Sequence, residues 1–152
     1  MIRAHWTALC TLLALLAGLP AHAADPAGMV KVAKGQVSIE RDGKKLPATV
    51  GSQIEVADRV HTGSDGSVGV TLRDNTLLSA GPNSLIVIDK FAFDNATQDG
   101  NMSIRIRKGT LSVASGKIAK RTPESVDFDT PTSVLGVRGT EFVIEVEGGR
   151  DE

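Results

Sequence analysis

The chain has 152 residues, 17 basic and 18 acidic side chains, and a formal net charge of -1 at pH 7. Because the two signs almost cancel, there is no basic field to attract nucleic acid, and binding of nucleic acid through phosphate contacts is excluded. The single cysteine excludes an intramolecular disulfide framework.

The first 24 residues have the pattern of a secretory signal peptide. Arg3 supplies a positive start, residues 6–19 form an uncharged apolar core, and residues 21–23 are a small-x-small cleavage site. The core is shorter than the roughly 18 to 20 residues that a membrane-spanning helix needs. We therefore expect cleavage after this segment and a periplasmic or secreted location. The mature chain, residues 25–152, is expected to form one domain without a transmembrane segment.

From residue 30 onward, apolar and polar residues alternate in short runs, which is typical of strands that bury one face. Groups of Gly, Asp, Asn, Ser and Pro separate the runs at close intervals and leave little room for helices. The pattern predicts an all-β fold and leaves two architectures open, a compact sandwich or a short β-solenoid-like stack of short strands. The runs contain Val30 and Val32; Val37 and Ile39; Val68, Val70 and Leu72; Leu85 and Val87; Ile104 and Ile106; Leu111 and Val113; and Phe142, Ile144 and Val146.

Two local signals refine this prediction. Asp42-Gly43 between two short alternating segments predicts a hairpin with a type I′ turn, because that turn needs positive φ at both central positions. The segment Gly35-Gln-Val-Ser-Ile has an echo in Gly109-Thr-Leu-Ser-Val, where a glycine again precedes two apolar residues on one strand face. Two copies do not define a repeat protein, but they suit similar short strands that stack in successive layers.

The segment 129–146 is the most informative part of the sequence. Thr130 and Pro131 mark a rigid turn, residues 133–137 form a predicted strand, and residues 141–146 form a second, alternating strand. The segment is therefore a strand-turn-strand unit without helix.

A short turn with two glycines, Gly136 and Gly139, joins these two predicted strands. Both glycines are expected to need an unusual φ or a close approach of backbone. Arg138 between them is expected to fold inward as a structural anchor, where its rigid fork of donors can satisfy carbonyl groups or a carboxylate. The alternative is that Arg138 is exposed on the turn and pairs with an acidic partner.

The mature chain has little that could carry catalysis. It has one histidine, His61, no cysteine, and no serine in a Gly-x-Ser-x-Gly elbow. His61 is expected to be a solvated residue at the end of a short strand. One histidine without cysteine excludes a zinc site, and the polar loops lack the spacing of a calcium-binding EF-hand. We therefore expect a non-enzymatic protein without catalytic, cofactor-binding or metal-binding residues.

Over residues 30–146, an ordered set of motifs resembles the FecR-like periplasmic domain family, the sensor half of transmembrane regulators of iron uptake and a widespread exported module. The positions that carry the family signature are Thr130, Pro131, Gly136, Arg138, Gly139 and Thr140. The matching motifs are Gly35-Gln-Val-Ser-Ile, Val50-Gly-Ser-Gln-Ile, Asp58-Arg-Val-His-Thr-Gly, Gly69-Val-Thr-Leu-Arg-Asp-Asn-Thr-Leu-Leu, Leu85-Ile-Val-Ile, Arg107-Lys-Gly-Thr-Leu and Thr130-Pro-Thr-Ser-Val-Leu-Gly-Val-Arg-Gly-Thr-Glu-Phe.

The resemblance implies an exported all-β domain that takes part in signal transduction by contacting another envelope protein, such as a membrane receptor or sensor, whose identity the sequence does not give. Such regulators carry a cytoplasmic anti-sigma segment and a membrane helix before the domain, and we expect this chain to have neither. The alternative function is binding of a small ligand or glycan in the envelope. No cofactor and no nucleic-acid partner are expected.

The strand that ends the family signature is the expected contact surface for the partner. Because the sequence stops shortly after this strand, we expect it to lie at an open sheet edge, where unpaired backbone groups accept another strand. Its residues are Glu141, Phe142, Val143, Ile144, Glu145 and Val146.

Overall fold

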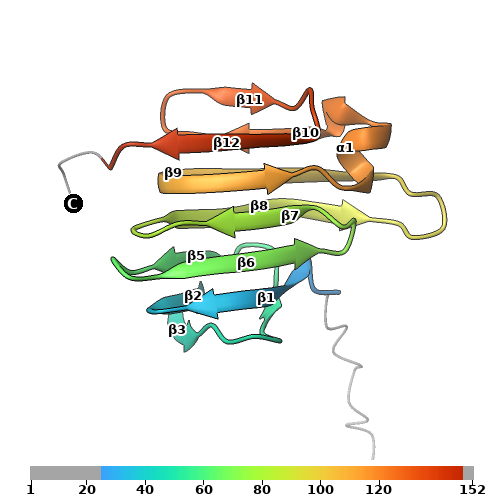
Figure 1. The fold of residues 1–152 in the computed structure, drawn as a ribbon. Helices are drawn as coiled ribbons and strands as arrows, with labels where there is room; N and C mark the ends of the chain where they lie inside the picture. Colours follow the sequence, from blue (N-terminus) through green and yellow to red (C-terminus); the bar gives the residue numbers. More distant parts are fainter. Residues whose placement is uncertain (1–24, 149–152) are drawn as a thin grey trace, which may run out of the picture.

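The computed structural model describes residues 25–148, so the expected signal peptide lies outside the described residues. This part of the chain contains twelve strands, one short α-helix and one 3-10 turn (Figure 1). None of its helices is long and apolar enough to cross a membrane. The elements are β1 (Gly28–Lys34), β2 (Val37–Arg41), β3 (Lys44–Pro47), β4 (Gln53–Ile54), β5 (Arg59–Thr62), β6 (Ser67–Leu72), β7 (Leu77–Ala80), β8 (Leu85–Phe93), β9 (Gly100–Ala114), α1 (Lys117–Arg121), η1 (Pro123–Ser125), β10 (Val126–Asp129), β11 (Val134–Gly136) and β12 (Glu141–Val146).

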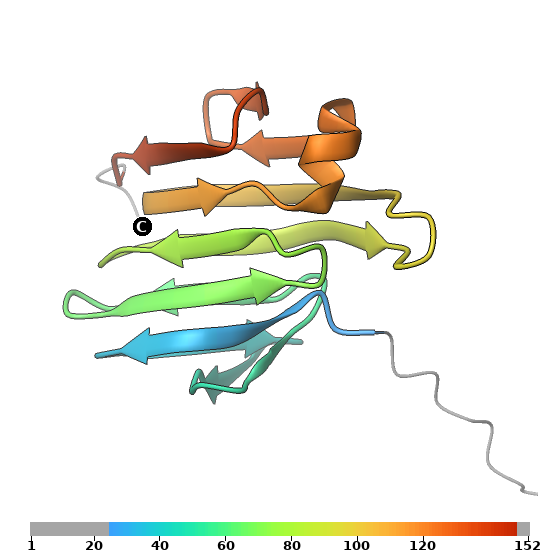
Figure 2. The same ribbon diagram turned by 45° about the vertical axis from the view of Figure 1, so that its right-hand side comes forward.

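The strands form a curled, mainly antiparallel sheet whose two halves face each other as layers. The path of paired strands is β3-β2-β5-β8-β9-β7-β6-β1-β4, with β10, β11 and β12 added beside β9. In the view of Figure 1, β1, β6, β7 and β12 belong to the front layer, and β2, β3, β5, β8 and β10 to the back layer. Both views place β11 and β12 at one end of the stack and β1 to β3 at the other (Figures 1 and 2). The prediction of an all-β fold is confirmed.

The long strand β9 belongs to both layers. Its first part pairs with β8 and, in parallel, with β10, and its second part pairs with β7 and β12. Gly109 lies between the two parts and has φ +90°. A Cβ atom at this position would lie 2.1 Å from Ser84 Oγ, and that Oγ accepts a hydrogen bond of 3.1 Å from Thr110 N. The crossing between layers therefore needs a residue without a side chain.

The core between the layers is almost entirely aliphatic. Strands with alternating buried and exposed residues place every second side chain inside, as the sequence periodicity predicts. At the end of the stack, Phe128 of β10 and Phe142 of β12 meet edge to face with 5.2 Å between ring centroids, so that they join the two layers. Fully buried large side chains are Phe128, Ile39, Ile54, Leu72, Ile88, Ile104, Ile106, Leu111, Ile118, Val30, Val113 and Val126.

The two local sequence signals have clear structural counterparts. Asp42 and Gly43, between β2 and β3, have φ of 51° and 74°, as a type I′ turn requires, so the predicted hairpin is confirmed. The two glycines of the sequence echo, Gly35 and Gly109, both have positive φ and both lie against other backbone, at Asp65 and Ser84 respectively. The echo therefore marks two sharp bends of the backbone, one between β1 and β2 and one inside β9, each followed by an alternating segment.

The short helix α1 is held by a buried carboxylate. Asp74, in the turn between β6 and β7, is fully buried and accepts hydrogen bonds from Thr76 N (3.0 Å), Thr76 Oγ1 (2.8 Å) and Ile118 N (3.3 Å). Ile118 in turn is fully buried in the core. This helix was not predicted from the sequence, because the carboxylate that binds its first turn lies 44 positions before the amide of Ile118.

The crossing in β9 generates a stability prediction. The substitution Gly109→Ala should lower the free energy of unfolding by about 2 kcal/mol or more, because the new methyl group meets Ser84 and the backbone has a strained φ for alanine. Gly43→Ala is the matched control, since Gly43 also has positive φ but no atom within 4 Å of the built Cβ, and should cost only about 1 kcal/mol. Urea denaturation of both variants measures the difference. Equal losses would contradict a packing constraint at the crossing.

Candidate interaction surfaces

The strand β12 lies at the edge of the front layer. It pairs with β9, where Glu141 lies opposite Ala114, and no other strand pairs with it among residues 25–148. Ser115 N donates a 2.7 Å hydrogen bond to Thr140 O, which makes these two residues a bonded pair. Bonded and non-bonded pairs alternate in an antiparallel ladder, so every second residue of β12 directs its N–H and C=O away from β9. These outward residues are Glu141, Val143 and Glu145.

The side chains of β12 alternate in the same way. Ile144 is buried, and Phe142 and Val146 are half-buried against the core. Val143 is 64% exposed between two exposed glutamates. An edge with acidic residues is protected from unspecific aggregation but keeps its backbone groups available.

A flat, uncharged row of side chains continues from this edge across the front layer. Val143 lies opposite Ser112 of β9, followed in register by Ser79 of β7, Gly69 of β6 and Val32 of β1. Val32 is also 46% exposed, and the three residues between the valines are small. The surface next to the open edge is therefore smooth and weakly polar.

The turn at Thr130 and Pro131 leads into a second edge, on the back layer. Thr130 N donates to Ser133 O (2.8 Å), and Thr130 Oγ1 accepts from Ser133 N (3.0 Å), which closes the hairpin between β10 and β11. The predicted strand 133–137 is shorter in the structure, where β11 is Val134–Gly136. Val134 and Leu135 are exposed on it.

The expected inward position of Arg138 is not found. Arg138 is exposed, and its side chain makes no hydrogen bond or ion pair with any other residue in the described range 25–148. The turn is held instead by Val137, which is buried, and by Ser115, whose Oγ donates to Gly139 O at 3.0 Å. Gly139 has φ +147°, but Gly136 has neither positive φ nor an atom within 4 Å of a built Cβ. The expectation of a backbone constraint is therefore met at Gly139 and wrong at Gly136.

The arginine that does act as an internal anchor is Arg41, at the end of β2. Its Nε and Nη2 donate to the two oxygens of Asp58 (2.8 and 2.7 Å), and its Nη1 donates to Glu55 Oε1 (2.6 Å). Asp58 is fully buried, and its Oδ2 also accepts from Glu55 N at 2.8 Å. The hydrogen bond to Asp58 raises the pKa of Arg41. This fork fixes the turn between β4 and β5 to the hairpin of β2 and β3.

Sequence reasoning missed Arg41 for a physical reason. The two partners lie 17 positions apart on strands whose pairing the sequence does not state. The only local indication of a buried ion pair is Asp58 itself, a carboxylate directly before the alternating residues of β5. A charge at such a position needs a buried partner, but the pattern does not say which one.

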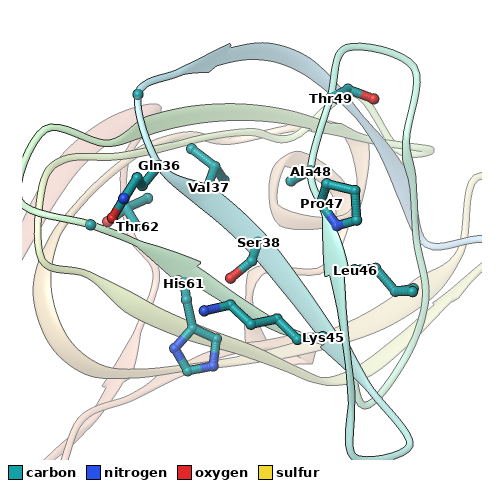
Figure 3. Close-up of a pocket in the computed structure, with 12 residues that line it drawn as sticks. Gln36, Val37, Ser38, Lys45, Leu46, Pro47, Ala48, Thr49, His61 and Thr62 are labelled. Atoms are coloured by element: carbon teal, nitrogen blue, oxygen red, sulfur yellow. The ribbon is translucent and has the colours of Figure 1, made fainter.

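His61 lies near the end of β5 beside an open hollow of about 650 Å³ (Figure 3). Figure 3 shows Lys45 and Ser38 reaching into the same hollow from β3 and β2. The His61 side chain is partly exposed, and its Nε2 lies 3.3 Å from Glu40 Oε2. No group of three or more His, Cys, Asp or Glu side chains in the described residues could hold a metal ion.

Arg41 and Arg138 should differ in how much they contribute to the free energy of unfolding. Asp58→Asn should lower the free energy of unfolding by about 2 to 3 kcal/mol, because it removes the buried carboxylate that accepts two hydrogen bonds from Arg41 and leaves only the more exposed Glu55 as its charged partner. Arg138→Ala should change it by less than about 0.5 kcal/mol, as for an exposed residue without partners. Urea denaturation measures both. A larger loss for Arg138→Ala than for Asp58→Asn would restore Arg138 as the anchor.

Comparison with known proteins identifies the family. The family model described as FecR protein matches residues 58–152, which is more than half of the chain. The match begins at the buried Asp58 and includes β5 to β12, whereas the motifs of β1 to β4 lie before it. No match was found among the curated proteins, and none among the solved structures. The chain belongs to the FecR family.

Proposed function

We propose that this chain is a non-enzymatic, periplasmic or secreted interaction module of the FecR type, which acts in signalling by binding another envelope protein. The family supplies the signalling context, and the half-paired strand β12 supplies a surface for the partner. The main support for the proposal is the free edge of β12. The backbone N–H and C=O groups of Glu141, Val143 and Glu145 point away from β9, and the side chain of Val143 is exposed between the two glutamates.

The mode of binding that fits this edge is strand addition. An extended segment of the partner would pair with the outward N–H and C=O groups of β12 and extend the front layer by one strand. Its side chains would then lie opposite Glu141, Val143 and Glu145. Opposite charges across a strand pair contribute roughly 0.2–1 kcal/mol each, and like charges are unfavourable. The partner segment should therefore carry basic residues on either side of an apolar one.

The hollow beside His61 supports the alternative function, binding of a small envelope ligand. Its volume lies within the usual range for ligand sites, and Lys45 and His61 offer polar contacts. No Phe, Tyr or Trp side chain lines it, so a sugar ring would have no large stacking platform there. A dose-dependent rise of the melting temperature with cell-wall fragments or iron chelates would favour this alternative.

The edge geometry predicts an alternating pattern of hydrogen exchange in β12. In the isolated mature domain, the amides of Glu141, Val143 and Glu145 should exchange at least about tenfold faster than those of Phe142 and Ile144, whose N–H groups bond to β9. Exchange followed residue by residue by NMR measures this. If all amides of the strand are protected in the monomer, the edge is already occupied and strand addition fails.

Partner chemistry can be tested with a matched peptide pair. A peptide Lys-Thr-Val-Thr-Lys should protect the outward amides of β12, and Glu-Thr-Val-Thr-Glu should not, because it places like charges opposite Glu141 and Glu145. The double variant Glu141→Lys and Glu145→Lys should reverse this preference. A pull-down of the mature domain from an envelope extract, with and without residues 141–152, then identifies the natural partner. An unchanged preference in the double variant would contradict pairing at this edge.

A further inference from the structure

Three arginines surround a shallow hollow on the outer face of the back layer. Arg59 of β5 and Arg105 of β9 lie on either side of Val87 of β8, because both are its register partners. Arg107 lies two positions after Arg105, at a register shift of the β8–β9 ladder, and lines the same hollow. The hollow has a volume of about 240 Å³, and Leu85 and Val87 are its main apolar lining. We call this site the arginine hollow.

The charges of the arginine hollow are not balanced from within the chain. Arg105 Nη2 lies 3.0 Å from Asp89 Oδ2, and Arg59 Nη1 lies 3.6 Å from Glu40 Oε1. The exposed Arg107 forms no ion pair within residues 25–148. The three guanidinium groups thus have two carboxylate partners, Asp89 and Glu40, which leaves an excess of one positive charge, although the chain as a whole carries a net charge of -1. Like charges gathered in this way repel one another, so an anionic ligand gains affinity there.

We infer that the arginine hollow binds an acidic, extended segment of a protein partner. A guanidinium presents a planar fork of donors that matches a carboxylate. Acidic residues two positions apart in an extended chain are about 7 Å apart, which is the backbone spacing of Arg105 and Arg107. The methylene groups of glutamate side chains can pack on Leu85 and Val87. The hollow is smaller than the roughly 300 Å³ at which small-molecule sites begin, which favours side chains of a macromolecule over an enclosed small ligand.

This site and the β12 edge of the proposed function adjoin at Arg107, which also lines a hollow with Glu145 and Glu147, but they differ in charge. The edge belongs to the front layer and is acidic, whereas the arginine hollow is basic and lies on β5, β8 and β9 of the back layer. The two surfaces therefore select partner segments of opposite charge. Either site can fail its test without affecting the other.

The test uses the mature domain and two synthetic peptides, Glu-Val-Glu-Val-Glu and Gln-Val-Gln-Val-Gln. In an NMR titration, the acidic peptide should shift the methyl signals of Leu85 and Val87, and the Gln peptide should not. The double variant Arg59→Gln and Arg107→Gln should weaken binding of the acidic peptide by roughly tenfold, because two of the three charge-assisted contacts are lost. The matched control Lys31→Gln and Lys34→Gln, on β1 of the front layer, should bind unchanged.

Three outcomes would overturn the inference. The first is an equal loss of affinity for the acidic peptide in the lysine control, which would show an unspecific charge effect. The second is binding of inorganic phosphate with the same methyl shifts and the same affinity, which would make the site a simple anion site. The third is tighter binding to vesicles of anionic phospholipid than to the peptide, which would make it a membrane contact. Circular dichroism spectra of the variants verify that all of them are folded.

Discussion

The whole architecture depends on the passage of β9 from the back layer to the front layer at Gly109. A sheet can close into two facing layers only if some strand changes layer, and a change of layer in the middle of a strand brings two stretches of backbone into contact. Here the contact is between Gly109 and Ser84. Since β7, β8, β10 and β12 all pair with β9, the position of each depends on this one crossing.

The two layers bury a core that contains almost no polar atoms, and the few buried polar groups lie at its borders. Asp58 and Asp74 are both fully buried, and both oxygens of each carboxylate accept hydrogen bonds. Arg41 donates to Asp58, and the donors to Asp74 are on Thr76 and Ile118. Each of them fixes a connection to an element that is distant in the sequence. Residues 25–148 contain no cysteine, so these carboxylates, rather than disulfides, link elements that are distant in the sequence.

Local patterns in the sequence predicted the parts of the fold that depend on local physics. The alternation of apolar residues gave the strands, and Asp42-Gly43 gave a hairpin with the correct turn type, because positive φ is a property of the turn residues themselves. The roles of the arginines could not be predicted in this way. Arg138 between two glycines looked like an anchor, but an anchor needs an acceptor in three dimensions, and that acceptor, Asp58, lies beside Arg41. The arginine hollow was missed for the same reason, since its members come from three strands.

The C-terminal strands β10 to β12 are attached to the rest of the sheet through β9. Both β10 and β12 add to β9, while the opposite side of β9 stays paired with β8 and β7. Detachment of β10 to β12, with the contact between Phe128 and Phe142 broken, therefore leaves the ladders from β1 to β9 intact. Opening of residues 126–146 alone therefore exposes less buried surface, and costs less free energy, than complete unfolding of the domain.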